Sequence, residues 1–165
     1  MNRLAYISTF IFALAGCSSQ RAISDHKPHS PSITFEVHHN ILIVEGYIND
    51  KWAKFIIDTG ASASILDYNQ FKKYHFTYNR DTDSNLTGFG GRSGMMKTSS
   101  VNFNLKGVDA PAIYRFSASD LSGINRVLAN SNQKILGILG SDFLQNHGAI
   151  IDYSKNKIVL NYLDH

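Results

Sequence analysis

Cysteine is almost absent from this 165-residue chain, and so is any concentration of positive charge. The single cysteine, Cys17, excludes an intramolecular disulfide. The formal net charge is only +3, and no block of Lys or Arg forms a stripe. The densest pair, Lys72 and Lys73, is typical of a solvated helix face. We therefore expect one small domain without a disulfide framework, and no nucleic-acid partner.

The sequence also lacks the ligand patterns of a zinc site. Four of its histidines fall in two groups, His26 with His29 and His38 with His39. Zinc needs three or four convergent ligands at a defined spacing, and the chain has neither a Cys pair nor a His-Glu-x-x-His motif. We predict no metal and no cofactor, and we assign these histidines to a tether and a turn.

The N-terminus carries an apolar stretch that is too short for a comfortable transmembrane helix. A short basic start, Met1-Asn2-Arg3, precedes the mostly apolar residues 4–15, which is the layout of a secretory signal. The stretch ends in Leu14-Ala15-Gly16-Cys17, which resembles the bacterial lipoprotein box. This resemblance implies that residues 1–16 are a signal peptide and that Cys17 is acylated. A plain signal peptide that ends at a chance cysteine is the alternative.

The residues after Cys17 predict a tether and a location. Residues 18–31 are polar, include Pro28 and Pro31, and show no apolar periodicity. Extended at ~3.5 Å per residue, they would reach at most about 50 Å. We therefore interpret residues 17–31 as a lipid-anchored tether. The sorting rule of such lipoproteins, applied to Ser18, implies the periplasmic face of the outer membrane in the bacterial cell envelope.

Residues 32–165 read as one β-rich domain. The strands that the sequence predicts are short, alternating or continuously apolar runs over 33–37, 41–48, 51–57 and 135–139, with a hairpin turn at Asn49-Asp50. Ser141 is predicted to cap a short helix over 142–146, and 149–160 to form a closing hairpin. Residues 117–133 are rich in Asn, Ser and Gly and predict an irregular surface loop with about one helical turn.

One stretch combines a buried strand with chemistry: Phe55-Ile56-Ile57-Asp58-Thr59-Gly60-Ala61-Ser62. A carboxylate at the end of an apolar strand is costly unless something needs it. Thr59 can hydrogen-bond locally, and Gly60 lets the backbone turn. A strand that ends in an Asx-type turn is the simpler alternative. However, a second apolar run, Ile135–Leu139, also ends at a glycine, Gly140, just before a helix.

Together these stretches resemble the retropepsin-like aspartic proteases, in which one Asp-Thr-Gly follows an apolar strand and Ile-Leu-Gly precedes a helix. The closer likeness is to the bacterial aspartyl-protease-like members, whose ending is similar to residues 137–144 and 148–153 here. The resemblance covers residues 33–163 approximately. It implies an all-β fold, a closed acid-protease barrel with one or two short helices.

The resemblance also implies roles for individual residues. Asp58 would be catalytic, and Thr59, Gly60 and Ala61 would support its loop. The glycine-rich residues 86–94 would form the flap that closes over substrate, although a merely loose hairpin is the alternative. The residues carried over to that flap are Gly88, Phe89, Gly90 and Gly91, and those carried over to the apolar-apolar-Gly motif are Ile138, Leu139 and Gly140.

A single Asp-Thr-Gly has a consequence for assembly. In the resembled family, peptide hydrolysis needs two such carboxylates close together, and this chain has one Asp-Thr-Gly. The resemblance therefore implies an aspartic endopeptidase that acts on peptide or protein substrates as a C₂ homodimer, with one Asp58 from each subunit. A catalytically silent peptide-binding lipoprotein and a structural envelope lipoprotein of the same fold remain the alternatives.

Overall fold

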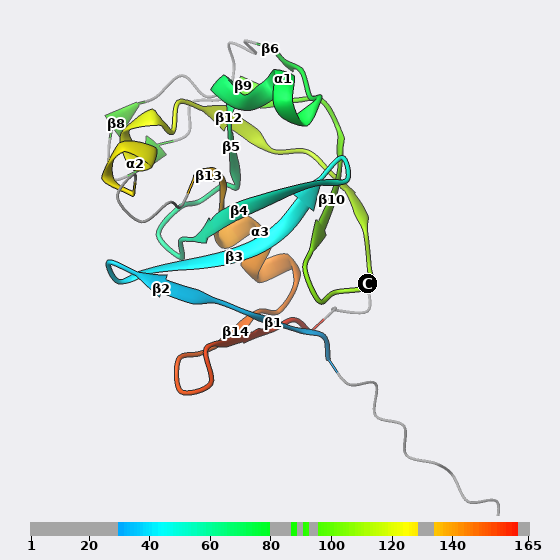
Figure 1. Ribbon diagram of the computed structural model, residues 1–165, viewed down its shortest axis with the longest axis vertical. Helices are drawn as coiled ribbons and strands as arrows, with labels where there is room; N and C mark the ends of the chain where they lie inside the picture. The colour runs from blue at the N-terminus through cyan, green and yellow to red at the C-terminus, as the bar shows by residue number, and fades with distance from the viewer. Residues whose placement is uncertain (1–29, 80–86, 89–90, 93–95, 129–133, 162–165) are drawn as a thin grey trace, which may run out of the picture.

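The computed structural model describes residues 30–79, 87–88, 91–92, 96–128 and 134–161, and it is mostly β-strand (Figure 1). The strands are β1 (Ser32–Thr34), β2 (Glu36–His38), β3 (Ile41–Ile48), β4 (Lys51–Ile57), β5 (Ile65–Asp67), β6 (Tyr78–Asn79), β7 (Thr87–Gly88), β8 (Gly91–Arg92), β9 (Met96–Thr98), β10 (Val101–Leu105), β11 (Ala112–Tyr114), β12 (Ser117–Ser119), β13 (Ile135–Leu139), β14 (Ile150–Asp152) and β15 (Lys157–Val159). The helices are a 3-10 turn (Tyr68–Gln70), α1 (Phe71–Tyr74), α2 (Ser122–Val127) and α3 (Ser141–Asn146). The predicted all-β fold is confirmed.

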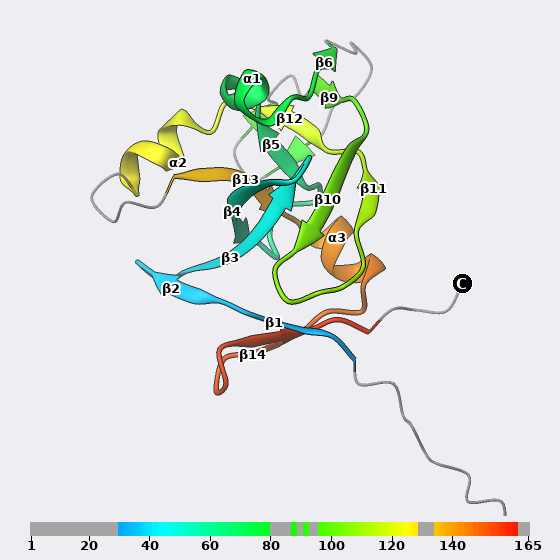
Figure 2. The same cartoon turned by 45° about the vertical axis from the view of Figure 1, so that its right-hand side comes forward.

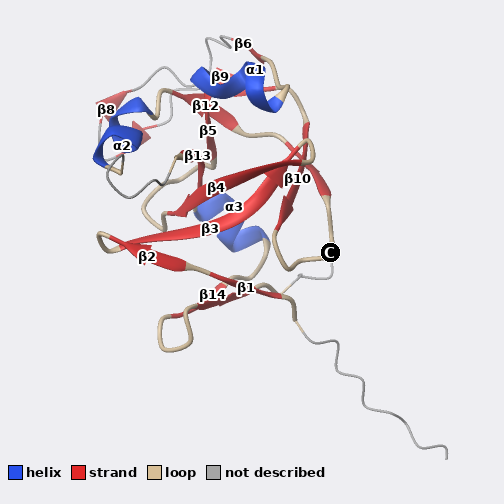
Figure 3. Ribbon diagram, viewed as in Figure 1, coloured by secondary structure: helices blue, strands red, loops and turns tan. Residues whose placement is uncertain are grey.

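The described strands form a curled main sheet, a smaller three-stranded sheet at one end of the molecule and the two-stranded β7–β8 sheet (Figure 2). The main sheet runs in the order β11-β10-β3-β4-β13-β5-β12-β9-β6, with β2 paired to β3, and curls into a half-barrel. The smaller sheet has the order β1-β15-β14. Figure 3 shows how little helix accompanies these strands.

The strand predicted over 33–37 is divided between two sheets. Its first part, β1, belongs to the small sheet, the chain passes through buried Phe35, and its second part, β2, joins the main sheet.

The β3–β4 hairpin is the longest pairing and follows the sequence prediction. Its register runs without interruption from Leu42 opposite Ile57 to Ile48 opposite Lys51. Asn49 and Asp50 have φ of 47° and 63°, the left-handed conformation that a tight two-residue hairpin turn needs. The hairpin therefore delivers the end of β4 to a fixed place.

Two hydrophobic cores lie on opposite faces of this hairpin. Successive side chains of a strand point to opposite faces, so Phe55 and Ile57 enter the main core while Ile56 enters a second one. The main core packs around Phe103, which makes edge-on contacts with Phe55, Phe116 and Phe143 at centroid distances of 5.4 to 5.7 Å. The second core consists of Ile43, Ile56, Ile65, Leu121, Leu128, Ile135 and Ile138, with Ile41, Ala61 and Ile124 packed against it.

The sequence predicted an irregular loop with about one helical turn over 117–133. A short helix is present, but the rest of the described part is less irregular than predicted. Residues 117–119 form β12, which pairs parallel with β5, and residues 122–127 form α2. Leu121, Ile124 and Leu128 follow the i, i+3, i+7 spacing of a helix face, and Leu121 and Leu128 are buried in the second core. Tertiary packing thus stabilises a helix whose Ser-, Gly- and Asn-rich sequence has weak helix propensity.

The tip of the β3–β4 hairpin is fastened to α1 and β10 by one side chain. Asn49 Nδ2 donates to the carbonyl oxygens of Tyr74 at 2.9 Å and His75 at 3.0 Å, at the C-terminal end of α1. Asn49 Oδ1 accepts from the Asn102 backbone N–H at 3.0 Å. These bonds satisfy carbonyl groups that a helix end leaves without a partner inside the helix.

We expect Asn49→Gly to lower the free energy of unfolding by about 1–3 kcal/mol, because glycine keeps the left-handed backbone but removes three hydrogen bonds. Asp50→Gly is the matched control, since Asp50 is exposed and also left-handed. It should change the free energy of unfolding by less than about 0.5 kcal/mol. Urea unfolding at one fixed protein concentration measures both. Equal effects of the two substitutions would contradict this role of Asn49.

Candidate active site

The two motifs predicted from the sequence meet at one edge of the main sheet. β4 and β13 pair in parallel, with Ile56 opposite Ile138 and Ile57 opposite Leu139. Parallel strands end at the same edge, so the residues that follow each strand emerge together. The Asp58 backbone N–H donates to the Leu139 carbonyl oxygen at 3.0 Å, which extends the pairing by one residue.

Asp58 turns out of the sheet with one carboxylate oxygen fixed. The Gly60 N–H donates to Asp58 Oδ1 at 2.8 Å, and the Ala61 N–H donates to the Asp58 carbonyl oxygen at 3.2 Å. The Asx-type turn foreseen in the sequence is therefore present. Asp58, Thr59 and Gly60 are exposed, whereas Ala61 is half-buried against the second core. The carboxylate thus stands in a defined place on an open surface.

Gly140 is required because the Asp58 loop passes directly over it. A Cβ at Gly140 would lie 2.7 Å from the Ala61 carbonyl oxygen and 2.8 Å from the carbonyl group of Ala63. Real Cβ atoms essentially never approach backbone atoms this closely. At Gly60 a Cβ would meet only Asp58 Oδ1, at 3.3 Å. The glycine of the second motif therefore decides how closely the two loops pack.

Ser141 holds the Asp58 loop and does not cap the helix, which corrects the sequence prediction. Gly140 is the N-cap residue of α3 and makes no side-chain capping bond. Ser141 donates twice to the neighbouring loop, from its N–H to the Ala61 carbonyl oxygen at 2.7 Å and from Oγ to the Thr59 carbonyl oxygen at 2.8 Å. Its hydroxyl stabilises the turn around Asp58.

A second aspartate lies behind the site and is fully engaged in structure. Asp142 accepts from the Ser64 N–H at 2.9 Å, from Ser64 Oγ at 2.7 Å and from the Phe143 N–H at 2.7 Å. Ser64 is buried, and its Oγ also accepts from the Gly140 N–H at 3.0 Å. Burial raises the pKa of the nearby Tyr114 hydroxyl, and the negative charge of Asp142 raises it further. Sequence reasoning missed this network because its partners lie 78 residues apart.

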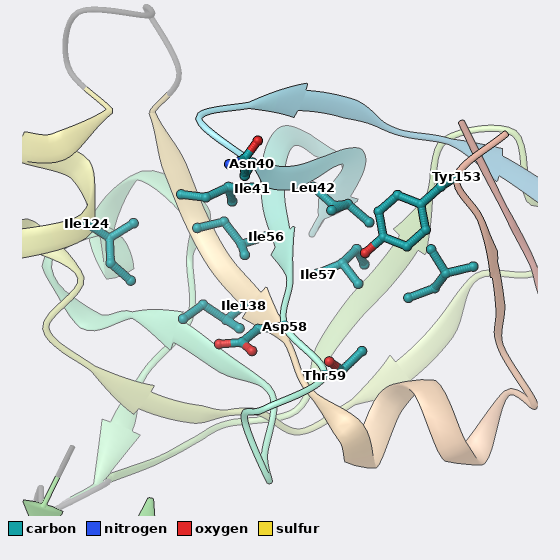
Figure 4. Close-up of a pocket in the computed structure, with 11 residues that line it drawn as sticks. Asn40, Ile41, Leu42, Ile56, Ile57, Asp58, Thr59, Ile124, Ile138 and Tyr153 are labelled. Carbon is teal, nitrogen blue, oxygen red and sulfur yellow. The ribbon is translucent and has the colours of Figure 1, made fainter. Parts of the chain in front are cut away.

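A hollow of about 350 Å³ opens beside Asp58 (Figure 4). This volume is within the range of small-ligand sites. Asp58 contributes the only carboxylate among the described residues that line it. The lining residues are Asn40, Ile41, Leu42, Ile56, Ile57, Asp58, Thr59, Ile124, Ile138, Ile151 and Tyr153.

The predicted site residues are brought together only in part. Ile138 lines the hollow, whereas Leu139 is buried behind it and contributes its carbonyl oxygen. Of the predicted flap, Gly88 and Gly91 pair with each other in the β7–β8 hairpin. Phe89 and Gly90 lie outside the described residues, and so does Cys17.

The hollow adds residues that the sequence prediction did not name, above all Ile124 and Tyr153. The helical spacing of Leu121, Ile124 and Leu128 was the available signal for Ile124. No local pattern marked Tyr153. Within the described residues, no group of three His, Cys, Asp or Glu side chains could hold a metal ion. No helix in the same part of the chain has the length and apolarity to cross a membrane.

We expect Gly140→Ala to lower the free energy of unfolding by about 1–3 kcal/mol, because its methyl group must displace the backbone at Ala61 or Ala63. Gly123→Ala in α2 is the matched control. A Cβ there meets nothing within 4 Å, and alanine favours a helix by up to about 1 kcal/mol. Thermal and urea unfolding of both variants measure the difference, and an unchanged stability of Gly140→Ala would refute the packing argument.

Comparison with solved structures finds similar folds at low identity. The retroviral protease-like domain of Ddi1 from Leishmania major has 20% identity and a TM-score of 0.46, covering 74% of this chain and 91% of that one. The protease of EIAV, solved with the inhibitor HBY-793, has 24% identity and a TM-score of 0.48, with coverages of 67% and 90%. A retropepsin-like aspartic protease from Rickettsia conorii has 16% identity and a TM-score of 0.49, with coverages of 79% and 90%.

Family membership is decided by sequence. No protein with a curated description matches the chain. The family model of the gag-polyprotein putative aspartyl proteases matches residues 44–146, which is more than half of the chain and includes both the Asp58 loop and α3. The sequence prediction of a retropepsin-like aspartic protease is therefore confirmed, and the chain belongs to the gag-polyprotein putative aspartyl protease family.

Proposed function

We propose that this protein is an aspartic endopeptidase that works as a homodimer, with Asp58 of each subunit in one shared catalytic centre. The observation that carries the proposal is the exposed Asp58 carboxylate beside an apolar hollow that contains no other carboxylate among its described lining residues. Membership of an aspartyl protease family supports hydrolysis of peptide bonds. A centre of two carboxylates would take its second one from another copy of the chain, and for this reason we propose a homodimer.

The chemistry requires two carboxylates that share one proton. Like charges at contact distance do not both ionise readily, so one carboxyl group stays protonated. The ionised Asp58 takes a proton from a water molecule, whose oxygen attacks the carbonyl carbon of the peptide bond. The protonated Asp58 of the other copy donates to the carbonyl oxygen. When the carbon–nitrogen bond breaks, the nitrogen receives the proton first taken from water. One hydroxyl group of the former carbonyl carbon returns its proton to the other Asp58, which restores the shared proton and leaves a carboxylic acid product.

Asp58 is the only carboxylate among the described residues that line the hollow, so one subunit does not present a second one there. Asp142 is the nearby candidate, but all its described contacts bind it to Ser64 and the start of α3. Releasing it would remove the acceptor of both the Ser64 N–H and the Ser64 hydroxyl hydrogen in a buried place, at a cost of about 1–3 kcal/mol for each group. A two-fold axis that passes beside Asp58 supplies an identical carboxylate without any rearrangement.

The surface around Asp58 suits contact with a second copy. Thr59 is exposed next to Asp58, where its hydroxyl can bond across the axis to the partner loop. β14 is an edge strand of the small sheet, and its first residue, Ile150, is 57% exposed. Tyr153, at the rim of the hollow, is 65% exposed. Large apolar side chains that are exposed in this way are typical of an interface.

We further propose the cell location implied by the N-terminal sequence: a bacterial envelope protein anchored through acylated Cys17, on the periplasmic side of the outer membrane. Multiple acyl chains give stable anchoring, whereas a single chain is marginal. The anchor would also confine the subunits to a surface and raise their effective concentration, which favours pairing.

We also propose that the β7–β8 hairpin is the flap, which closes over bound peptide.

The test of the catalytic proposal compares Asp58→Asn with Asp50→Asn. Digestion of denatured casein by the purified chain should fall at least about 100-fold for Asp58→Asn, because the base and the acid are both lost. It should be unchanged for Asp50→Asn, which alters an exposed aspartate in the β3–β4 turn. Analytical ultracentrifugation should show a dimer for all three proteins.

Mixed pairs make the test specific for a shared centre. Excess Asp58→Asn subunits, added under conditions that allow exchange, should suppress wild-type activity beyond simple dilution, because a mixed pair has one carboxylate. Activity that depends only on the amount of wild-type subunit would contradict the proposal. A monomer that binds peptide equally well with either residue at position 58 would favour a silent peptide-binding protein.

The test of the anchor uses Cys17→Ser. In a bacterial expression host, wild-type protein should incorporate labelled palmitate and sediment with membranes, since the thiol carries the first acyl chain. The Cys17→Ser variant should do neither. Equal labelling of the two proteins would show that Cys17 is not the acylation site.

A further inference from the structure

The hollow beside Asp58 has two apolar sides that belong to different cores. Figure 4 shows one group of isoleucines on the side of α2 and a second group with Tyr153 on the side of the small sheet. The α2 side consists of Ile41, Ile56, Ile124 and Ile138, all members of the second core or packed against it. The second core is therefore not closed: it ends in an opening next to the Asp58 carboxylate.

Ile124 is the part of this opening that comes from outside the sheet. Ile41, Ile56 and Ile138 stand on β3, β4 and β13, and each of the three residues is paired with a neighbouring strand. Ile124 stands on α2, which is held by the burial of Leu121 and Leu128 on either side of it. Ile124 itself is only half-buried. Its position, unlike that of the other three, depends on how one short helix is fixed.

Asn125 fixes that helix to β13. Its Oδ1 accepts from the Ile135 N–H at 2.7 Å, and its Nδ2 donates to the Ile135 carbonyl oxygen at 3.1 Å. The side-chain amide thus bonds to both backbone groups of the first residue of β13. Gln70 Nε2 donates to the same carbonyl oxygen at 2.9 Å. The other end of β13 provides the Leu139 carbonyl oxygen that receives the Asp58 N–H.

We propose that Ile124 is a specificity-determining residue, which limits the size of the substrate side chain that enters the α2 side of the hollow, and that Asn125 is the positioning residue for it. The ligand is an aliphatic side chain adjacent to the bond that is cleaved, because Asp58 stands at the rim and the surrounding wall is formed by isoleucine. This inference rests on the proposed function for its substrate, but the size selection does not require turnover.

Small changes in such a wall have measurable effects. One methylene more or less in a hydrophobic pocket changes selectivity by about 10–200-fold. Ile124→Ala removes three carbons of the wall and should admit aromatic side chains. Ile124→Val removes one carbon and gives a milder change should the alanine variant fail to fold. Val127→Ala is the matched control, because Val127 is on the same helix, is 67% exposed and does not line the hollow.

The probe is a series of alanine-rich octapeptides in which one central residue is Ala, Val, Leu, Phe or Trp. Using the full chain, the ratio of kcat/KM for the Phe peptide to that for the Leu peptide should rise at least about 10-fold in Ile124→Ala. Val127→Ala should leave the ratio unchanged. Asn125→Ala should move this kcat/KM ratio toward one, because a helix that is no longer fixed to β13 discriminates less between the two side chains. General destabilisation of the protein would lower both kcat/KM values without changing their ratio.

Binding of the same peptides to Asp58→Asn protein separates this inference from the proposed function. Suppose that protein with Asp58 intact cleaves none of the peptides, but that adding Ile124→Ala to Asp58→Asn still changes the ratio of Phe-peptide to Leu-peptide affinity. The catalytic proposal then fails and the size-selecting wall stands. If peptides are cleaved and the ratio is the same in wild type, Ile124→Ala and Ile124→Val, the wall is refuted and the catalytic proposal stands. Absence of both cleavage and selective binding overturns both.

Discussion

The parallel pairing of β4 with β13 is the constraint on which the rest of the site depends. It places Asp58 and Gly140 side by side, and the bond from the Asp58 N–H to the Leu139 carbonyl oxygen closes the arrangement. Because each strand is buried, neither end can shift without disturbing a core. The chain thereby holds an exposed carboxylate in a defined place, which a flexible loop alone would not achieve.

The two aspartates that follow β4 and β13, Asp58 and Asp142, differ in how their carboxylates are bound. Asp58 has one oxygen held by the Gly60 N–H and stands at the edge of the hollow. Asp142 has its oxygens occupied by Ser64 and by the start of α3. One is free to meet substrate, and the other keeps the loops in register. In the proposed homodimer, Asp58 is the carboxylate that each subunit contributes to the shared centre.

The same strand also connects the site to the wall that would select substrate. β13 holds Asp58 at its C-terminal end and Asn125 at its N-terminal end, while Ile138 between them lines the hollow. The proposed specificity and the proposed chemistry thus share one rigid element. Sites supported by strands are positioned more accurately than sites on loops alone.

Local sequence patterns predicted the parts of this arrangement that depend on local physics. β3, β4 and the turn at Asn49-Asp50 could be predicted from apolar runs and turn residues, and Asp58 and Gly140 from motifs at strand ends. The structural role of Ser141 could not be predicted, because its hydrogen bonds go to Thr59 and Ala61, about 80 residues earlier in the chain. For α2, the sequence predicted only about one helical turn somewhere in 117–133. Its position could not be predicted, because packing against the second core stabilises this helix more than its own propensity does.

The most direct test of the central claim is the distance between the two Asp58 carboxylates in a crystal structure of the protein with a peptide-like inhibitor. The account predicts a two-fold pair in which the carboxylates approach to about 3 Å and face the inhibitor together. An inhibitor held by a solitary subunit, or a pair whose Asp58 residues lie far apart, would contradict it.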